Sequence, residues 1–377
     1  MLAVVAAFAV LAAPVGASDR DSTPTAPPPR IEAAAWYLVG ADGTVLAQHR
    51  ARQRRAPASI TKLVTALVAL ERSSPAEIVT VDPRAVGVGE STVYLRARER
   101  LTVAELLRAM LIRSANDAAQ ALALHVGAGS VERFVALMNA KAQELGLTDT
   151  SFRNPHGLDA PGHVSSARDA TLLLRHALGV PFIRDALARE TISLPGGRVF
   201  PTTDDLQAGW SALIGGKTGH TRAAGWSEAA AAKERGITVY GTVLGSDSRG
   251  ERNDALRALL EHGLARYVSM SVVGRGRVYV EAGTQYGGPK VELVAPKGIV
   301  RPLLRGTPLV ERVVAPTVVP LPVRAGKALG RVEVWRGNEL VASSNLVAAE
   351  AVAEPGLLGK VRWYATRTIA NLWGLVT

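Results

Sequence analysis

The stretch Ser59-Ile60-Thr61-Lys62 places a hydroxyl and an amine three positions apart, directly after Ala56-Pro57-Ala58, at the predicted start of a helix. Residues i and i+3 lie on one face of a helix, so the amine of Lys62 can reach the Ser59 oxygen. A serine hydroxyl becomes an effective nucleophile only when a nearby base takes its proton, and an uncharged lysine is such a base. The spacing alone is common, so the fold has to bring further partners to this pair.

Two later segments are candidates for those partners. Ser114-Ala115-Asn116 lies between apolar helical runs at 101–112 and 117–126, which predicts a helix–helix junction. Lys217-Thr218-Gly219-His220 lies on a predicted strand, where a glycine lets the backbone approach a ligand closely.

The ordered set Ser-x-x-Lys, Ser-x-Asn and Lys-Thr-Gly resembles the penicillin-binding proteins and serine β-lactamases. From about residue 32 onward, the chain is similar to the low-molecular-mass D-alanyl-D-alanine carboxypeptidases. The segments that carry this resemblance are 46–48, 57–62, 114–119, 154–158, 165–169 and 217–221. It implies an enzyme that removes the terminal D-alanine from peptidoglycan stem pentapeptides through an acyl-enzyme on Ser59, and that β-lactams such as penicillin inhibit.

The resemblance also assigns roles around the nucleophile. Lys62 would be the general base, and Ser114 would relay a proton to the leaving D-alanine. The backbone N–H groups of Ser59 and His220 would form the oxyanion hole, in which each donor is typically worth about 3 kcal/mol. Asn116 would hold the acyl-side amide of the substrate.

The substrate carboxylate would meet Lys217 and Thr218 beside Gly219. Arg252 aligns with a family arginine near this carboxylate, and Arg249 is its rival. Because like charges disfavour a second ammonium, Lys217 should also lower the pKa of Lys62. No cofactor is expected, and the seven histidines show no metal-ligand spacing.

Composition limits the remaining classes. A chain of 377 residues with 47% hydrophobic content can bury a sizeable core, and its length predicts two domains. The net charge of +11 attracts polyanions, but basic clusters such as 50–55 lack interleaved aromatic residues, so nucleic-acid binding is not expected. The absence of cysteine excludes disulfides.

The pattern along the chain predicts an α+β catalytic domain over residues 31–268, similar to the serine β-lactamase and penicillin-binding-protein fold, with a mixed antiparallel sheet and a helical block. The expected elements are a hairpin at 32–48, helices from 59 to about 178 with N-caps at Thr102 and Ser130, strands at 191–200 and 223–245 with a turn at 233–236, and a helix at 253–267.

The chain ends have different compositions. Residues 1–17 are apolar and small, which predicts a signal peptide, and residues 18–30 are a Pro-rich linker. Residues 269–350 alternate in hydrophobicity and predict a small all-β domain, which resembles the C-terminal domain of the carboxypeptidase family. Residues 354–377 predict a basic amphipathic helix with aromatic margins.

That helix suits the surface of a membrane, although docking on the β domain is an alternative. A membrane-spanning helix is disfavoured, because the charges of Lys360, Arg362 and Arg367 would be costly at mid-bilayer depth. The sequence therefore predicts an exported protein, anchored peripherally at the periplasmic or extracytoplasmic face of the cell membrane.

Three alternative functions stay open. A class A β-lactamase needs a glutamate for deacylation, but the corresponding region 154–170 offers only Asp159 and Asp169 as acids, and Asp169 is better suited to capping a helix. A DD-endopeptidase or transpeptidase would share the same nucleophile set. A catalytically inactive wall-binding protein of this fold would not need the intact motifs.

Overall fold

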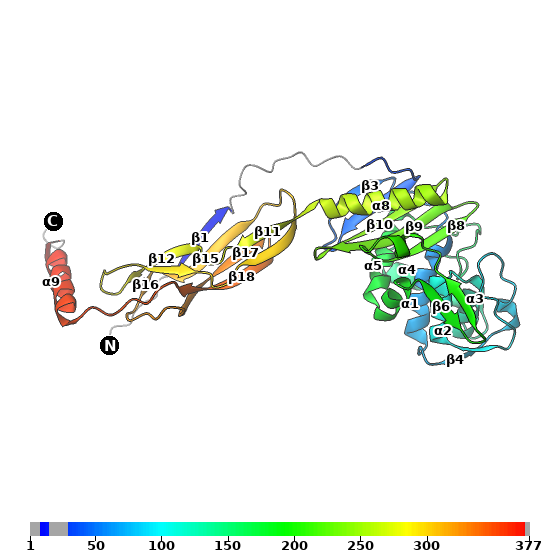
Figure 1. The fold of residues 1–377 in the computed structure, drawn as a ribbon, viewed down its shortest axis with the longest axis horizontal. Helices are drawn as coiled ribbons and strands as arrows, with labels where there is room; N and C mark the ends of the chain where they lie inside the picture. The colour runs from blue at the N-terminus through cyan, green and yellow to red at the C-terminus, as the bar shows by residue number, and fades with distance from the viewer. Residues whose placement is uncertain (1–7, 15–28, 374–377) are drawn as a thin grey trace. The chain divides into compact units, whose positions relative to one another are not determined.

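The structure, a computed structural model, describes residues 8–14 and 29–373. It divides into two compact units, Thr25–Arg266 and Met1–Pro24 with Tyr267–Thr377 (Figure 1). The division between them lies close to the predicted end of the catalytic domain. Each unit has a hydrophobic core of its own, one from residues 35–244 and the other from residues 272–348.

A five-stranded antiparallel sheet forms the centre of the first unit. Its strand order is β3-β2-β10-β9-β8. The bounds are β2 Ala35–Gly40, β3 Val45–His49, β8 Leu213–Thr221, β9 Gly225–Glu234 and β10 Ile237–Ser246. The predicted first hairpin and the hairpin that follows Lys-Thr-Gly are both present. The strand that carries Lys217 lies at an edge of the sheet.

Helices pack on both faces of this sheet. Neighbouring residues of a strand point to opposite faces, and β10 shows the two sides. Gly241 lies against Leu260 of α8 (Arg249–Ala265), whereas the Thr242 hydroxyl accepts a hydrogen bond of 2.7 Å from Thr171 of α5 (Ala167–Gly179). In Figure 1, α8 and α5 accordingly lie on either side of the sheet.

The remaining helices form the predicted helical block. They are η1 Ala58–Thr61, α1 Lys62–Arg72, η2 Pro83–Ala85, α2 Val103–Ile112, α3 Asn116–Val126, α4 Val131–Glu144, α6 Pro181–Leu187 and α7 Leu206–Gly209. Two short hairpins accompany them, β4 Ile78–Thr80 with β5 Arg100–Thr102, and β6 Thr191–Leu194 with β7 Arg198–Pro201. The apolar faces of α1 to α5 make most of the buried core.

Helix starts follow the capping residues. Thr102 caps α2 in a reciprocal capping box, and the Ser130 side chain caps α4, so both predicted N-caps are confirmed. The predicted start of the last helix at 253 is wrong. That helix starts at Arg249, because Ser248 and Glu251 form a second capping box four residues earlier.

The second unit is all-β up to its last helix, as the alternating pattern predicts. A seven-stranded sheet has the order β1-β15-β17-β18-β13-β12-β16, and β11 pairs with β14. The bounds are β11 Tyr267–Val273, β12 Val278–Thr284, β13 Val291–Val294, β14 Ile299–Leu304, β15 Val310–Pro316, β16 Val318–Val319, β17 Ala328–Arg336 and β18 Glu339–Ala348.

The predicted signal peptide lies only partly within the described residues. Its segment Phe8–Pro14 is strand β1, which pairs antiparallel with β15. Residues 1–7 and 15–17 lie outside the description, as does most of the predicted linker. Cleavage of this segment stays a prediction.

Helix α9 (Leu357–Trp373) contacts the second unit through its first turns. Trp363 packs edge-on against Tyr286 with ring centroids 5.6 Å apart, and Lys360 bonds Glu354 at 2.7 Å. Other apolar side chains of this helix are open to solvent: Leu358 is 88% exposed and Ile369 is 56% exposed.

Among the described residues, no single helix has the length and apolarity needed to cross a membrane. The bent pair α3–α4 meets these criteria of length and composition jointly.

Candidate active site

Ser59 and Lys62 meet as the sequence predicts, but through a tighter turn. Residues 58–61 form the 3₁₀ turn η1, and α1 begins only at Lys62. Side chains at i and i+3 eclipse in a 3₁₀ turn, and Lys62 Nζ donates to Ser59 Oγ at 2.8 Å. Ser59 is therefore not a helix N-cap but is held directly against the amine.

Lys62 is enclosed by acceptors. Its Nζ also donates to Asn116 Oδ1 at 2.7 Å and to the backbone carbonyl of His156 at 2.6 Å. The residue has no exposed surface. This burial, reinforced by the positive charge of Lys217, holds the pKa of Lys62 well below its usual range. The predicted effect of Lys217 is thus present, but burial is the larger cause.

Ser114 contacts the strand that carries Lys-Thr-Gly. It lies between α2 and α3, at the predicted junction, with a φ of 63°. Lys217 Nζ donates to Ser114 Oγ at 3.0 Å and to the Thr218 carbonyl at 3.0 Å. Burial lowers the pKa of Lys217 to about 8. The two lysines and two serines of the predicted set therefore come together from three segments.

The backbone closes in around Ser59 from two sides. A Cβ added to Gly219 would lie 3.2 Å from the Ser59 nitrogen, so this glycine lets the strand lie against the turn of the nucleophile. Its close approach to a ligand stays a prediction. On the other side, a Cβ at Gly157 would lie 2.0 Å from the Ala58 carbonyl oxygen. The loop 154–158 therefore packs directly against η1, the turn that carries the nucleophile. This contact is called the seat of η1.

Thr218 and His220 flank this approach. The Thr218 hydroxyl shares a hydrogen bond of 2.8 Å with Thr203, a residue that the sequence did not single out. His220 is exposed, and its ring lies 4.1 Å from the Trp226 ring. A side chain stacked in this way supports the strand, which leaves the backbone of His220 for the role implied by the resemblance.

Arg252 does not lie as expected. Its side chain is buried under the sheet, where its Nε is 3.1 Å from Glu228 Oε2 and its Nη2 is 3.5 Å from Asp205 Oδ2. The guanidinium pairs with two acids of this chain. It is therefore placed to support the strand of Lys217, and not to bind the substrate carboxylate directly. The rival Arg249 forms an ion pair with Asp205.

The acids of the β-lactamase alternative have structural partners. Asp159 accepts from Thr221 Oγ1 at 2.6 Å and from the Ala223 nitrogen at 3.1 Å, so it fixes the β8–β9 turn. Asp169 accepts from the Asp149 nitrogen at 2.7 Å, and Ser166 is the residue that caps α5. Both carboxylates are thus engaged in holding the backbone of this chain, and the predicted capping role of Asp169 belongs to Ser166.

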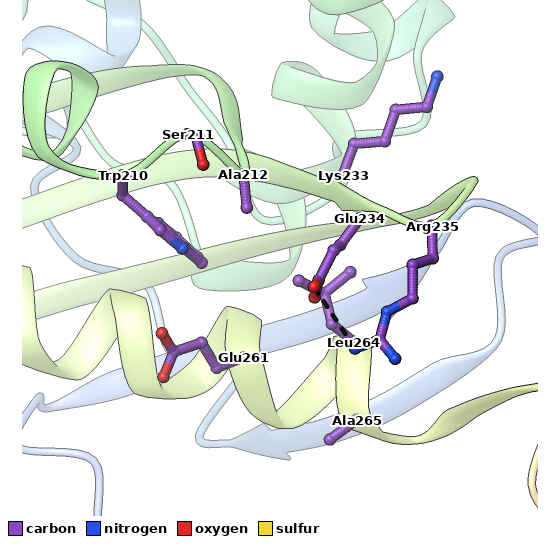
Figure 2. A pocket seen from close by; sticks show the side chains of 9 residues that line it. All are labelled: Trp210, Ser211, Ala212, Lys233, Glu234, Arg235, Glu261, Leu264 and Ala265. Atoms are coloured by element: carbon purple, nitrogen blue, oxygen red, sulfur yellow. Dashed lines mark hydrogen bonds and ion pairs between the residues drawn. The ribbon is translucent and has the colours of Figure 1, made fainter.

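A hollow of about 420 Å³ lies elsewhere on this unit (Figure 2). Trp210, Lys233, Glu261 and Leu264 are among its lining residues. It is at the end of the sheet where β9 turns into β10 and shares no residue with the catalytic set. It is therefore not the substrate cleft.

Two of the functional contacts were not predictable from motifs. The carbonyl of His156 is a backbone group, and its loop was noted only for the resemblance. The acids Asp204 and Glu228, which lie under Lys217, belong to none of the sequence motifs.

Family models match both units. A D-alanyl-D-alanine carboxypeptidase model matches residues 22–248, and a model of the penicillin-binding protein 5 C-terminal domain matches residues 267–354. The chain is 32% identical over 380 residues to the D-alanyl-D-alanine carboxypeptidase DacD of Salmonella typhimurium, with 95% of each chain covered. It is 31% identical to DacD of Escherichia coli, covering 91% of this chain and 93% of that one.

Solved structures agree with these matches. The chain is similar to penicillin-binding protein 5 from Haemophilus influenzae, with a TM-score of 0.64 at 28% identity, covering 87% of this chain and all of that one. It is also similar to the Streptomyces K15 DD-transpeptidase, with a TM-score of 0.61 at 30% identity, over 64% of this chain and all of that one.

Proposed function

The chain belongs to the D-alanyl-D-alanine carboxypeptidase family, and we propose that it releases the terminal D-alanine of peptidoglycan stem peptides through an acyl-enzyme on Ser59. The observation that carries this proposal is the convergence of two hydrogen-bonded pairs, Ser59 with Lys62 and Ser114 with Lys217. The positive charge of Lys217 acts on Lys62, and Lys62 also bonds Asn116, two residues from Ser114. The reaction is acyl transfer to water, in which the bond between two D-alanines breaks and the acyl group passes first to the serine oxygen.

Lys62 takes the proton of Ser59 in the attack. Its nitrogen is already within hydrogen-bonding distance of Ser59 Oγ, and its lowered pKa favours the neutral amine. The backbone N–H groups of Ser59 and His220 would donate to the developing oxyanion, a role supported by the close approach of Gly219 to the Ser59 nitrogen.

Ser114 carries the proton to the leaving group. Lys217 Nζ donates to Ser114 Oγ, so the hydroxyl can pass its own proton to the departing amine and take one from Lys217 in its place. In the hydrolysis step Lys62 returns its proton to Ser59, and the attacking water supplies the proton that Lys217 lost. Lys217 and Thr218 would bind the substrate carboxylate, and Asn116, fixed by Lys62, would bind the acyl-side amide.

The test is a stem pentapeptide incubated with the purified protein, with free D-alanine measured over time. We expect release that penicillin blocks and that the Ser59→Ala variant lacks. Rapid turnover of a β-lactam without D-alanine release would instead identify a β-lactamase. Transfer of the acyl group to an added amine acceptor, in place of hydrolysis, would identify a transpeptidase.

We further propose that α9 attaches the protein to the outer face of the cell membrane. The support is a helix with exposed Leu357, Leu358 and Val361 and with basic residues on its polar side. Deleting residues 355–377 should release the protein from anionic lipid vesicles while D-alanine release persists. Continued co-sedimentation of the truncated chain with vesicles would contradict this proposal.

A further inference from the structure

Two carboxyl groups are buried side by side beneath the strand that carries Lys217. Asp204 lies in the loop before α7 and is 4% exposed, and Glu228 on β9 is fully buried. A Cβ added to Gly216 would lie 2.9 Å from Glu228 Oε1 and 3.0 Å from Asp204 Oδ2. The two acids therefore converge on one point of β8, next to Lys217.

Three of the four carboxyl oxygens of this pair have no hydrogen-bond donor among the described residues. They are both oxygens of Glu228 and the Oδ2 of Asp204, whereas Asp204 Oδ1 accepts from the Leu206 nitrogen at 3.0 Å. Arg252 forms an ion pair with Glu228 Oε2 but does not meet hydrogen-bond geometry. The two acids lie within hydrogen-bonding reach of each other. Two ionised carboxylates repel at such a distance, and unpaired buried oxygens are costly. One proton between the two acids removes both problems.

The surrounding charges show what a single negative charge would do there. Lys217 on β8 and Arg252 on α8 are both buried cations, and Arg252 Nε faces Glu228 Oε2 at 3.1 Å. At the exposed rim, Asp205 is paired with Arg249, and Lys62 lies beyond Lys217. Burial and the charge of Arg252 lower the pKa of Lys217, whereas the negative charge of the acid pair raises it.

We propose that Asp204 and Glu228 are positioning residues that share one proton, and that their remaining negative charge keeps Lys217 protonated beneath the site of the substrate carboxylate. The consequence for activity rests on the proposed role of Lys217. The shared proton is a property of the fold and can be measured without activity.

Sharing predicts a particular response to substitution. In Asp204→Asn the remaining Glu228 ionises, and in Glu228→Gln the remaining Asp204 ionises, so either single variant keeps one negative charge. Only the double variant loses that charge. The lysine would then lose its proton at a lower pH, because nearby opposite charge no longer favours its charged form.

The first experiment measures the second-order rate of Ser59 acylation by penicillin against pH, using the full chain. We expect the alkaline limb of the profile to move by less than about 0.3 unit in each single variant and by about one unit to lower pH in the double variant. Glu234→Gln, on the same strand β9 but exposed, is the matched control and should leave the profile in place.

Two results would overturn the proposal. Equal shifts in both single variants would show two separate negative charges, and an unshifted double variant would show none. The Michaelis constant for a stem pentapeptide at pH 8 should rise about tenfold in the double variant, with a smaller change in kcat. Glu228→Leu removes the same carboxyl group as Glu228→Gln but also removes the polar amide. If charge alone sets the alkaline limb, the pH profiles of these two variants should match.

The second experiment does not depend on activity or on the double variant folding. An infrared difference spectrum at pH 7, wild type minus each single variant, should contain the carbonyl band of one protonated carboxylic acid. A wild type without this band refutes the shared proton even if D-alanine release is established. A wild type with it retains the shared proton even if the proposed enzyme activity fails.

Discussion

At the scale of single residues, the enclosure of Lys62 decides how it can act. Its Nζ contacts Ser59, Asn116 and the His156 carbonyl and has no exposed surface. An ammonium in this place loses its hydration, so the uncharged amine is favoured. The same enclosure that fixes the nitrogen against Ser59 Oγ thus also prepares it to accept a proton.

This enclosure predicts the acid limb of the pH profile. Below its pKa Lys62 carries a proton and cannot act as a base, so acylation should rise with pH through a pKa well below 10.5. Lys62→Arg, which cannot deprotonate, should lower the rate of penicillin acylation by about 10²–10⁴-fold. Acylation that rises only near pH 10 would contradict a lysine of lowered pKa.

Ser114 combines a strained backbone with a functional hydroxyl. Its φ of 63° is in the left-handed region, which costs a non-glycine residue about 1–2 kcal/mol. Ser114→Gly and Ser114→Ala both remove the hydroxyl that contacts Lys217, so D-alanine release should fall in both. Only the glycine relieves the strain, so the free energy of unfolding of Ser114→Gly should exceed that of Ser114→Ala by about 1 kcal/mol. Denaturant titration of the two variants measures this difference. Equal stabilities would show that the strain is absent.

Motif residues could be predicted because their chemistry shows locally, whereas the acid pair could not. Ser59 and Lys62 are identified by their spacing together with the Ser-x-Asn and Lys-Thr-Gly segments that follow them. Asp204 and Glu228 are 24 positions apart in the sequence, and nothing local shows that a loop and a strand will bury them together under Lys217. Arg252 was assigned to the cleft by its alignment with a family arginine, and the sequence does not show that Glu228 would pair with it.

At the scale of elements, the contact between Gly157 and η1 connects the loop 154–158 to the nucleophile. Gly157 has a φ of 95°, and its Cα faces the Ala58 carbonyl so closely that no side chain fits. A methyl group at this position would displace the turn that carries Ser59. A displacement of about 1 Å is enough to lower a rate by about 10²-fold.

Gly157→Ala should therefore reduce penicillin acylation by about 10²-fold and lower the midpoint of thermal unfolding. Gly146→Ala is its matched control, since this glycine also has a positive φ, 67°, but has open space around it. The control should lose about 1 kcal/mol of stability and keep its acylation rate. Equal losses of acylation in the two variants would show that backbone strain, and not the seat of η1, is responsible.

Element boundaries followed local chemistry where that chemistry was recognised. The hairpin after Lys-Thr-Gly was predictable, because an apolar alanine run and a β-branched segment flank a turn that contains a glycine. The start of α8 was not predicted, because the capping box of Ser248 and Glu251 lies within the arginine-rich stretch that was assigned to substrate binding. The 3₁₀ form of η1 depends on its seat against Gly157 and Gly219, which are distant in sequence.

At the scale of the whole molecule, the two units have separate cores. Residues 35–244 supply one hydrophobic cluster and residues 272–348 the other. The change from mixed to alternating hydrophobicity near residue 271 made this division predictable. A domain with its own core can unfold as its own cooperative unit.

Calorimetry should therefore resolve two unfolding transitions. Penicillin, which would acylate Ser59 in the first unit, should raise the midpoint of one transition and leave the other in place, because a ligand stabilises only the folded unit that binds it. The Ser59→Ala variant is the control and should lose most of this shift while keeping both transitions. A chain ending at Arg266 should retain the penicillin-sensitive transition alone. A single transition that moves as a whole with penicillin would show that the two cores unfold together, and that the second unit contributes to the stability of the catalytic one.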